Sequence, residues 1–450
     1  MILINLAECV IITTRSNGRV SYMSVANKQE YRPRVVDSQV ERYLKNFGAV
    51  CIEGPKWCGK TWTSSFHSKS EFLIGDPNNN FQNRQLAEIS PSLVLEGETP
   101  RLIDEWQEVP SIWDAVRYTV DNRGAKAQFI LTGSSTPQRK GVLHSGAGRI
   151  GKLRMRTMSL YESGDSSGTV SLKDICEGNL VPTLTGEVDI RDLIYYVVRG
   201  GWPGNIGSSL EDAQILPESY INAILDDDAQ RIDGIKHDKR KMRLLLRSLA
   251  RNESTTAKNG KLLNDIKEYE DESIDRDTLS EYLGVFTRLF LLDNQPAFSS
   301  NVRSSVRIKQ AEKRHFCDPA LACAIIKATP DRLLNDLNTF GFMFEALCER
   351  DLKIYAESFD AEVMHYQDYQ NREIDAVIEM KDGRWCAFEI KLGANQIEEA
   401  AKNLISIRDS IAKEKDGVVP SALCVICGMA SAAYVRSDGV FVVPITALKN

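Results

Sequence analysis

The fold of this chain is decided by residues 49–61, which read AVCIEGPKWCGKT. The first four residues are apolar and predict a short buried strand. The strand runs directly into a G-x-x-x-x-G-K-T pattern between Gly54 and Thr61, and a helix is predicted from Thr61 towards His67. A phosphate-binding loop requires this strand–loop–helix context, so the pattern predicts a P-loop.

The residue types of this loop suit a nucleotide triphosphate. Glycines allow successive backbone N–H groups to point into one concavity and face phosphate oxygens. Lys60 would neutralise the β- and γ-phosphates, the Thr61 hydroxyl would bind Mg²⁺, and the following helix would direct its positive end at the same anion. The predicted ATP-binding residues are Gly54, Pro55, Lys56, Trp57, Cys58, Gly59, Lys60, Thr61 and Trp62.

A second expected element is an acidic residue at the end of another strand. Residues 101–105 read RLIDE and supply it. Asp104 would hold Mg²⁺ through water, and Glu105 would polarise the attacking water, because hydrolysis needs a base beside the γ-phosphate. The alternative is a solvated acidic turn.

Two further segments carry candidate catalytic side chains. Residues 127–135 predict a third strand that ends in hydroxyls, where Thr132 and Ser134 could hold the lytic water; the alternative is strand-end capping. Residues 144–156 contain glycines and three arginines and predict a mobile arginine-bearing segment. Arg149 is its catalytic candidate, because a guanidinium stabilises charge on a transferring phosphoryl group. A basic surface loop is the alternative, and an arginine acting in trans would require a neighbouring subunit.

Taken in order, GPKWCGKTWT, PRLIDEWQEVPSIWD, FILTGSSTP and GRIGKLRMRTMSLYESG resemble the AAA+-type P-loop ATPases of bacteria and archaea that carry a DUF4143 C-terminal region. The resemblance covers roughly residues 33–450. It implies an ATPase core that uses ATP and Mg²⁺. It also includes the RGGWP element at residues 199–203, which we expect to pack a lid against the nucleotide domain.

The middle of the chain has helical periodicity and a basic segment at residues 236–247. Three short helices followed by an apolar run at residues 289–292 predict a winged-helix-like module, whose recognition helix would begin at residues 278–282. Such a module can place a helix in the DNA major groove. Acidic residues in that helix leave protein contacts equally open. A second basic stretch at residues 303–314 could meet a phosphate backbone.

A hairpin near the carboxyl end carries a second chemical pattern. A strand at residues 372–380 and a return strand at residues 385–391 flank an Asp-Gly turn signal, which places Asp375 within one residue of opposing Glu389. Glu389 and Lys391 lie two apart and share a face. Glu345, on a helix predicted over residues 340–354, could join them.

Converging carboxylates and a lysine are typical of metal-dependent phosphodiester cleavage, with Asp375 and Glu389 on Mg²⁺ and Lys391 orienting water. The layout resembles the PD-(D/E)XK nuclease-like fold, although Glu373-Ile374 replaces the proline expected before the aspartate. Two alternatives remain open, namely a salt-bridged hairpin and a nuclease-like domain without activity.

The composition limits the class of protein to which this chain can belong. The chain has 450 residues, 42% of them hydrophobic and 26% charged, and a net charge of −6, which is typical of a globular protein and excludes a histone-like coat. Ten scattered cysteines predict that the protein resides in a reducing cytoplasm. No apolar run approaches the ~20 residues that a membrane helix needs.

We therefore expect an α/β protein with an AAA+-like P-loop NTPase core, a helical winged-helix-like middle and a restriction-endonuclease-like C-terminal domain. The expected boundaries are a disordered leader at residues 1–32, then 33–200, 201–330 and 331–450. The leading hypothesis is an ATPase that acts on DNA through its middle and C-terminal domains. Assembly into a homo-oligomer is left open. The alternative is a nucleotide-switched binding protein whose nuclease-like domain is inactive.

Overall fold

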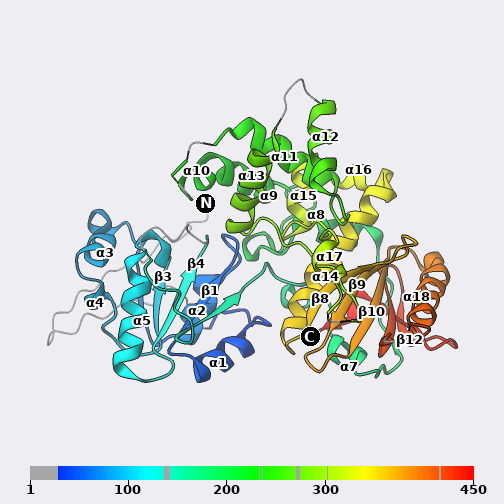
Figure 1. Cartoon of the computed structure of the whole chain (residues 1–450), viewed down its shortest axis with the longest axis horizontal. Helices are drawn as coiled ribbons and strands as arrows, with labels where there is room; N and C mark the ends of the chain where they lie inside the picture. Colours follow the sequence, from blue (N-terminus) through cyan, green and yellow to red (C-terminus); the bar gives the residue numbers. More distant parts are fainter. Residues whose placement is uncertain are drawn as a thin grey trace, which may run out of the picture.

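The computed structural model describes residues 29–135, 142–232, 234–235, 237–269, 274–301, 303–414 and 417–450. Residues 1–28 of the expected leader lie outside this range. A blue-to-cyan α/β unit and a yellow-to-red α/β unit lie on either side of a green helical region in Figure 1. The arrangement places one sheet near each end of the molecule, with the helices between and above them.

The first sheet has the order β2-β3-β4-β1-β5, and all its strand pairs are parallel. Its strands are β1 (Ala49–Glu53), β2 (Ser70–Leu73), β3 (Arg101–Asp104), β4 (Phe129–Gly133) and β5 (Ile150–Arg154). The helices around it are α1 (Asp37–Asn46), α2 (Lys60–His67), α3 (Asn78–Ile89), α4 (Pro91–Val94) and α5 (Ser111–Arg123), with the 3-10 turn η1 (Trp106–Glu108).

Strand β1 is buried along its whole length because helices cover both faces of the sheet. Ala49 and Cys51 pack in the core that contains α5, whereas Val50 and Ile52 pack in the core that contains α1. Parallel strands all end at the same edge. The loop after β1 therefore lies beside the ends of β3 and β4, where a ligand is expected in an open α/β sheet.

Strand β5 differs from the sequence prediction, which expected a mobile arginine-bearing segment here. It pairs with β1 in parallel, with Ala49 opposite Ile150 and Glu53 opposite Arg154. Ile150 and Leu153 are buried against the sheet. Lys152 between them, with Arg149 and Arg154 on either side, obscured this short apolar pattern.

The middle region is helical. Its main helices are α8 (Ile190–Arg199), α9 (Ile215–Ala223), α11 (Lys239–Arg251), α12 (Asn259–Tyr269), α13 (Arg276–Arg288), α15 (Pro319–Ile326) and α16 (Pro330–Asn335). Shorter elements are the 3-10 turn η2 (Pro203–Asn205), the π-helical η3 (Ile224–Asp228), α10 (Ala229–Arg231) and α14 (Val306–Lys309). After α13, isolated antiparallel bridges join Leu292 to Phe316 and Gln295 to Lys313. The winged-helix assignment stays a prediction.

The second sheet has seven strands in the order β7-β12-β13-β11-β10-β9-β8. Its strands are β7 (Thr183–Leu184), β8 (Glu362–Gln367), β9 (Glu373–Glu379), β10 (Trp385–Lys391), β11 (Ala422–Cys427), β12 (Ala432–Val435) and β13 (Phe441–Pro444). Helix α17 (Leu337–Glu357) packs in the core on one face, and α18 (Ile397–Ile411) packs in the core on the other. The antiparallel register that pairs Ala376 with Phe388 places Asp375 opposite Glu389, as the Asp-Gly turn predicted.

Residues after β5 join this second sheet. Strand β7 extends it through β12, and β6 (Val170–Ser171) pairs with β14 (Leu448–Lys449) near the carboxyl end. The short helices α6 (Leu160–Ser163) and α7 (Leu172–Cys176) contribute to the same core as α17. The predicted domain boundaries stay predictions. Among the described helices, none combines the length and the apolar character that crossing a bilayer requires.

Candidate functional site

Close packing and backbone conformation restrict two positions of the loop after β1 to glycine. A Cβ atom on Gly54 would lie 2.1 Å from the carbonyl oxygen of Met155. Gly59 has a φ of 104°, a left-handed conformation that disfavours side chains, and it precedes the first turn of α2. The loop therefore passes directly against the end of β5 and then turns sharply into the helix.

Lys60 and Thr61 begin α2 at the predicted phosphate position. Lys60 is buried, and its Nζ donates to the Pro55 carbonyl oxygen at 2.8 Å, so the ammonium group lies across the loop. The Thr61 hydroxyl donates to Asp104 Oδ1 at 3.0 Å. The structure thus brings together the lysine, the hydroxyl and the acidic residue that the sequence had placed on separate elements.

Asp104 is held by hydroxyl groups at the end of β3. Thr132 Oγ1 donates to Asp104 Oδ1 at 2.5 Å, and Thr132 Oγ1 itself accepts from the Glu105 backbone N–H at 3.0 Å. Burial raises the pKa of Asp104, and the neighbouring Glu105 charge adds to this, while the hydrogen bonds from Thr132 and Thr61 oppose it. A carboxylate beside a hydroxyl provides oxygen ligands of the kind that Mg²⁺ takes together with phosphate oxygens and water. These residues therefore fit a Mg²⁺–nucleotide complex.

Glu105 lies in a small hydrogen-bond network. Ser134 Oγ donates to Glu105 Oε2 at 2.9 Å, and Gln107 Nε2 contacts both that carboxylate and, at 3.2 Å, Ser134 Oγ. Glu105 has a φ of 56°, an uncommon conformation for a residue with a side chain that is often found at functional sites. Sequence reasoning missed Gln107; its position two residues after Glu105 was the available signal.

A cavity of about 830 Å³ opens in front of the loop. Its volume lies within the range of about 300–1,000 Å³ that is usual for small-molecule sites. Lys60, Thr61, Glu105 and Ser134 line it. Pro203 of the RGGWP element also lines it, and further lining residues that were not predicted are Ile74, Gly75, Phe81, Arg84, Glu108 and Gly204. The exposed rings of Trp57, Trp62 and Phe81 offer apolar surface for a base.

The loop also contacts the middle region. Trp202 of the RGGWP element is fully buried, and its indole N–H donates to the Lys56 carbonyl oxygen at 3.1 Å. Lys56 Nζ lies 2.5 Å from Asp228 Oδ1, at the end of the π-helical segment. The Trp57 ring packs edge-on against Tyr220 of α9, with 5.7 Å between the ring centroids. The RGGWP element therefore contacts the nucleotide loop as expected, whereas its role in packing a lid stays a prediction.

Arg149 lies away from this cavity. It immediately precedes β5, whereas the loop follows the opposite, carboxyl end of β1 in a parallel pair. Its Nε lies 2.8 Å from Asp121 Oδ1, and the side chain is half exposed. Arg154 and Arg156 lie at the correct end of β5 but pair with buried Asp293, at 3.3 Å and 2.6 Å. The structure therefore brings no predicted arginine to the nucleotide cavity within one chain.

The second predicted site, in the C-terminal sheet, is a cluster of carboxylates and lysines. Lys391 Nζ lies 2.6 Å from Glu389 Oε2 and 3.2 Å from Asp375 Oδ2. Asp375 Oδ2 also accepts the Ile390 N–H at 2.8 Å, and Glu389 Oε1 accepts from Asn403 Nδ2 at 2.8 Å. All three predicted strand residues therefore meet.

The helix side of this cluster adds groups that the sequence did not predict. Lys313 Nζ forms a close ion pair with Glu345, and the same Nζ lies 4.0 Å from Asp375 Oδ1. One helical turn after Glu345, Glu349 accepts from Gln295 Nε2 at 2.6 Å. The signal for Lys313 was its place in the second basic stretch, but only the fold brings it to α17.

Burial dominates the electrostatics of this cluster. It raises the pKa of Glu345 to about 7, and that of Glu349 and Glu389 to about 8, against ordinary values of 4.5. The Asp375 charge raises the pKa of Glu345 and Glu389 further. Burial acts in the same direction on Asp375, but Lys391 and Lys313 hold its pKa below the usual value. Protons and ammonium groups together neutralise this cluster.

This arrangement does not fit a bound divalent metal. An ammonium group already lies between Glu345 and Asp375, and a second one contacts Asp375 and Glu389. Within the described part of the chain, no group of three or more acidic, histidine or cysteine side chains is arranged to hold a metal ion.

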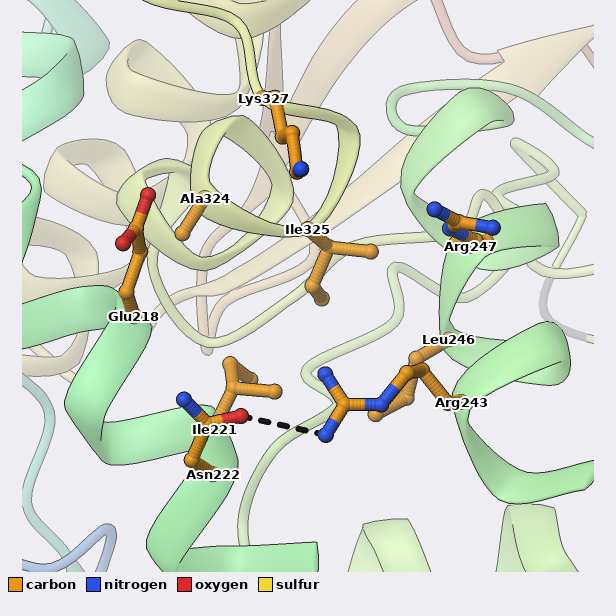
Figure 2. A pocket seen from close by; sticks show the side chains of 9 residues that line it. All are labelled: Glu218, Ile221, Asn222, Arg243, Leu246, Arg247, Ala324, Ile325 and Lys327. Carbon is orange, nitrogen blue, oxygen red and sulfur yellow. Dashed lines mark hydrogen bonds between the residues drawn. The ribbon is translucent and has the colours of Figure 1, made fainter. Parts of the chain in front are cut away.

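A smaller pocket of about 210 Å³ lies between α9, α11 and α15 (Figure 2). Its floor contains Ile221, Leu246 and Ile325. Arg243 and Arg247 of α11 and Lys327 border it, and Arg243 donates to Asn222 Oδ1 at 3.1 Å. The pocket is therefore apolar inside with a mostly basic border.

Comparison with known families divides the chain into three segments. Residues 46–163 match the model of an AAA domain, residues 190–332 match a domain of unknown function (DUF8612), and residues 340–448 match another domain of unknown function (DUF4143). The chain thus has segments that match an AAA domain and DUF4143, in the order that the sequence resemblance predicted. The nuclease-like assignment of the latter stays a prediction.

Two uncharacterized mycobacterial proteins are similar over most of the chain. Uncharacterized protein Rv2008c of Mycobacterium tuberculosis and uncharacterized protein Mb2031c of Mycobacterium bovis are each 24% identical over 359 residues, which is 79% of this chain and 72% of each relative. Among solved structures, the Walker-type ATPase PABY2304 of Pyrococcus abyssi aligns with a TM-score of 0.40 and 13% identity, over 66% of this chain and 96% of that one.

Proposed function

We propose that this protein binds ATP with Mg²⁺ and hydrolyses it at the loop that joins β1 to α2. The observation that carries the proposal is the hydrogen-bonded contact of Thr61, Asp104 and Thr132 next to a nucleotide-sized cavity that Lys60 and Thr61 line. Lys60 would exchange the Pro55 carbonyl oxygen for phosphate oxygens, and Thr61 and Asp104 would hold the metal ion. When bound, that ion would neutralise charge on the β- and γ-phosphates.

Glu105 would then polarise the attacking water. Ser134 and Gln107 already bind its carboxylate, so they can orient it without a large movement of the backbone. Loss of the carboxylate charge should stop the chemical step, whereas loss of the Lys60 ammonium should weaken nucleotide binding itself.

Two variants separate these roles. Lys60→Ala should lose binding of a fluorescent ATP analogue and lose phosphate release. Glu105→Gln should keep binding, because the side-chain size is unchanged, yet lower the turnover number at least 10²-fold. Wild-type protein that binds neither ATP nor GTP by calorimetry would contradict the proposal.

We further propose that the middle region senses the nucleotide. Lys56 and Trp57 belong to the loop, and both contact the middle region, through Asp228 and Tyr220. If the loop moves when phosphate binds, η3 and α9 must move with it or lose these contacts. Hydrogen exchange of η3 with and without a non-hydrolysable ATP analogue tests this. Unchanged protection at saturating nucleotide would contradict it.

We also propose that DNA is a partner. The charges of the described residues favour α11 over α13 as the helix that contacts the DNA backbone. Arg240, Arg243, Arg247 and Arg251 are exposed and follow one another at steps of three or four residues, so they lie along one side of α11. By contrast, the exposed positions of α13 include Asp277 and Glu281 beside Arg276. A phosphate backbone would be repelled by that helix and attracted by α11.

Anisotropy of a labelled DNA duplex over a salt series tests the α11 contact. The double variant Arg243→Glu/Arg247→Glu should weaken binding and reduce the salt slope by about two, since each lost phosphate contact lowers it by about one. Arg276→Glu on α13 is the matched control and should change neither quantity. The reverse result would assign the contact to α13, and wild-type protein that binds no duplex would exclude DNA.

A further inference from the structure

Lys313 stands out because it is a buried lysine at a position where a nuclease-like domain would need a cation. Only about 5% of its side-chain surface is exposed. It forms a close ion pair with Glu345 on α17, lies 4.0 Å from Asp375 Oδ1, and donates to the Asp375 carbonyl oxygen at 3.3 Å. Its ammonium group therefore lies between the helix acid and the strand acid.

The backbone around Lys313 fixes this position. The Lys313 N–H donates to the Gln295 carbonyl oxygen, and the Gln295 N–H donates to the Lys313 carbonyl oxygen, both at 2.9 Å. The Gln295 side chain in turn donates to Glu349 and, at 2.9 Å, to the Met364 carbonyl oxygen. Lys313 is thus held by a paired segment that is anchored to both α17 and the sheet.

We propose that Lys313 is an internal cation that occupies the metal position of the C-terminal carboxylate cluster and closes this cluster to divalent ions. Two buried carboxylates, from Glu349 and Glu389, and two that are mostly buried, from Glu345 and Asp375, lie around the ammonium groups of Lys313 and Lys391. A divalent ion would have to displace Lys313 into a buried environment without a partner, which is unfavourable for a charged group.

A further observation supports this assignment. The buried atoms Gln295 Oε1 and Glu349 Oε1 have no hydrogen-bond partner among the described residues. The cluster therefore has unused acceptor capacity, and the position of one ammonium group is what closes it to a cation.

The proposal is independent of ATP hydrolysis, because it concerns the cluster alone and is tested without nucleotide. Mn²⁺ binding to the full chain is measured by electron paramagnetic resonance, for the wild type and for Lys313→Ala, Lys313→Met and Lys309→Ala. Lys309 is an exposed lysine four residues away and serves as the control. Each variant is repeated with Asp375→Asn, which reports whether the bound ion lies in the cluster.

The wild type and Lys309→Ala should show no Mn²⁺ binding that depends on Asp375. Lys313→Ala, or Lys313→Met if the alanine variant does not fold, should gain one Mn²⁺ ion with at least tenfold higher affinity, and Asp375→Asn should abolish it. Wild-type binding that Asp375→Asn removes would overturn the proposal. A folded Lys313 variant that gains no ion would overturn it equally. If neither Lys313 variant folds, the wild-type measurement alone is used: Mn²⁺ binding that depends on Asp375 overturns the proposal, and its absence supports the proposal.

Discussion

Gly54 offers the sharpest test of the nucleotide site, because a single methyl group has no room there. A Cβ atom at this position would lie 2.1 Å from the Met155 carbonyl oxygen. Ordinary carbon–oxygen contacts lie at about 3.3 Å or more, so Gly54→Ala must separate the two chain segments by about 1.2 Å. Met155 cannot yield easily, because it is buried and its N–H donates to the Glu53 carbonyl oxygen at 2.7 Å.

The displacement must therefore fall mainly on the loop. A misplacement of about 1 Å in a catalytic site can cost about 10²-fold in rate, which corresponds to about 2.7 kcal/mol. We expect kcat/KM for ATP to fall by about that factor in Gly54→Ala. The assay is steady-state phosphate release, with binding of a fluorescent ATP analogue measured alongside.

The control is Gly284→Ala on α13, where an added Cβ meets no atom within 4 Å. It should leave turnover within about twofold of the wild type, since helical glycine is replaced there without a clash. Circular dichroism and thermal melting establish that both variants fold. A folded Gly54→Ala protein with wild-type turnover would refute the assignment of this loop as the phosphate cradle.

Three further outcomes are expected. Trp202→Phe leaves the part-buried Lys56 carbonyl oxygen without its donor at a cost of about 1 kcal/mol, so the KM for ATP in steady-state phosphate release should rise about fivefold. Asp228→Asn should change this KM less than twofold, because the Lys56 ammonium is partly exposed. Glu389, whose pKa is raised from 4.5 to about 8 by burial and then by the Asp375 charge, holds a proton in the folded state that the unfolded chain releases, so its contribution to stability is present at low pH and is lost as the pH rises through about 8. Denaturant titrations between pH 5 and pH 7 should show an unfolding free energy that falls with rising pH more steeply in the wild type than in Glu389→Gln, by about 1 kcal/mol per pH unit, and equal slopes in the two proteins would contradict the assignment. Arg149→Ala should keep wild-type ATPase activity in dilute solution; a loss that appears only as the protein concentration rises would place Arg149 in the site of a neighbouring subunit.

The parts of the fold that the sequence predicted are those set by local patterns. The strand at residues 49–53 and the helix that follows the loop are specified by a short apolar run and by a glycine with a left-handed backbone. The strands at residues 373–379 and 385–391 are specified by alternation and by an Asp-Gly turn, and their register follows from the turn. In each case the decisive residues lie within about ten positions of one another, so tertiary context adds little.

The parts that the sequence did not predict depend on contacts between distant segments. Strand β5 contains only two buried side chains within a basic run, and its pairing with β1 decides its conformation. Arg149 was assigned to the nucleotide site because arginines act there in other ATPases, but strand direction places it at the other edge. In the sequence, Lys313 belongs to a stretch that looks like a basic surface. Its backbone pairing with Gln295 places it beside Glu345 of α17.

The two candidate sites are joined by buried charged and polar groups. Arg156 follows Met155, whose carbonyl oxygen limits the space at Gly54, and its Nε lies 2.6 Å from Asp293 Oδ2. Asp293 is two residues from Gln295, the residue that pairs with Lys313 and binds the α17 acid. Removing one partner from a buried ion pair costs about 3–5 kcal/mol. Buried contacts therefore link the segment beside Gly54 to the segment that carries Lys313, and removal of any one partner would be unfavourable.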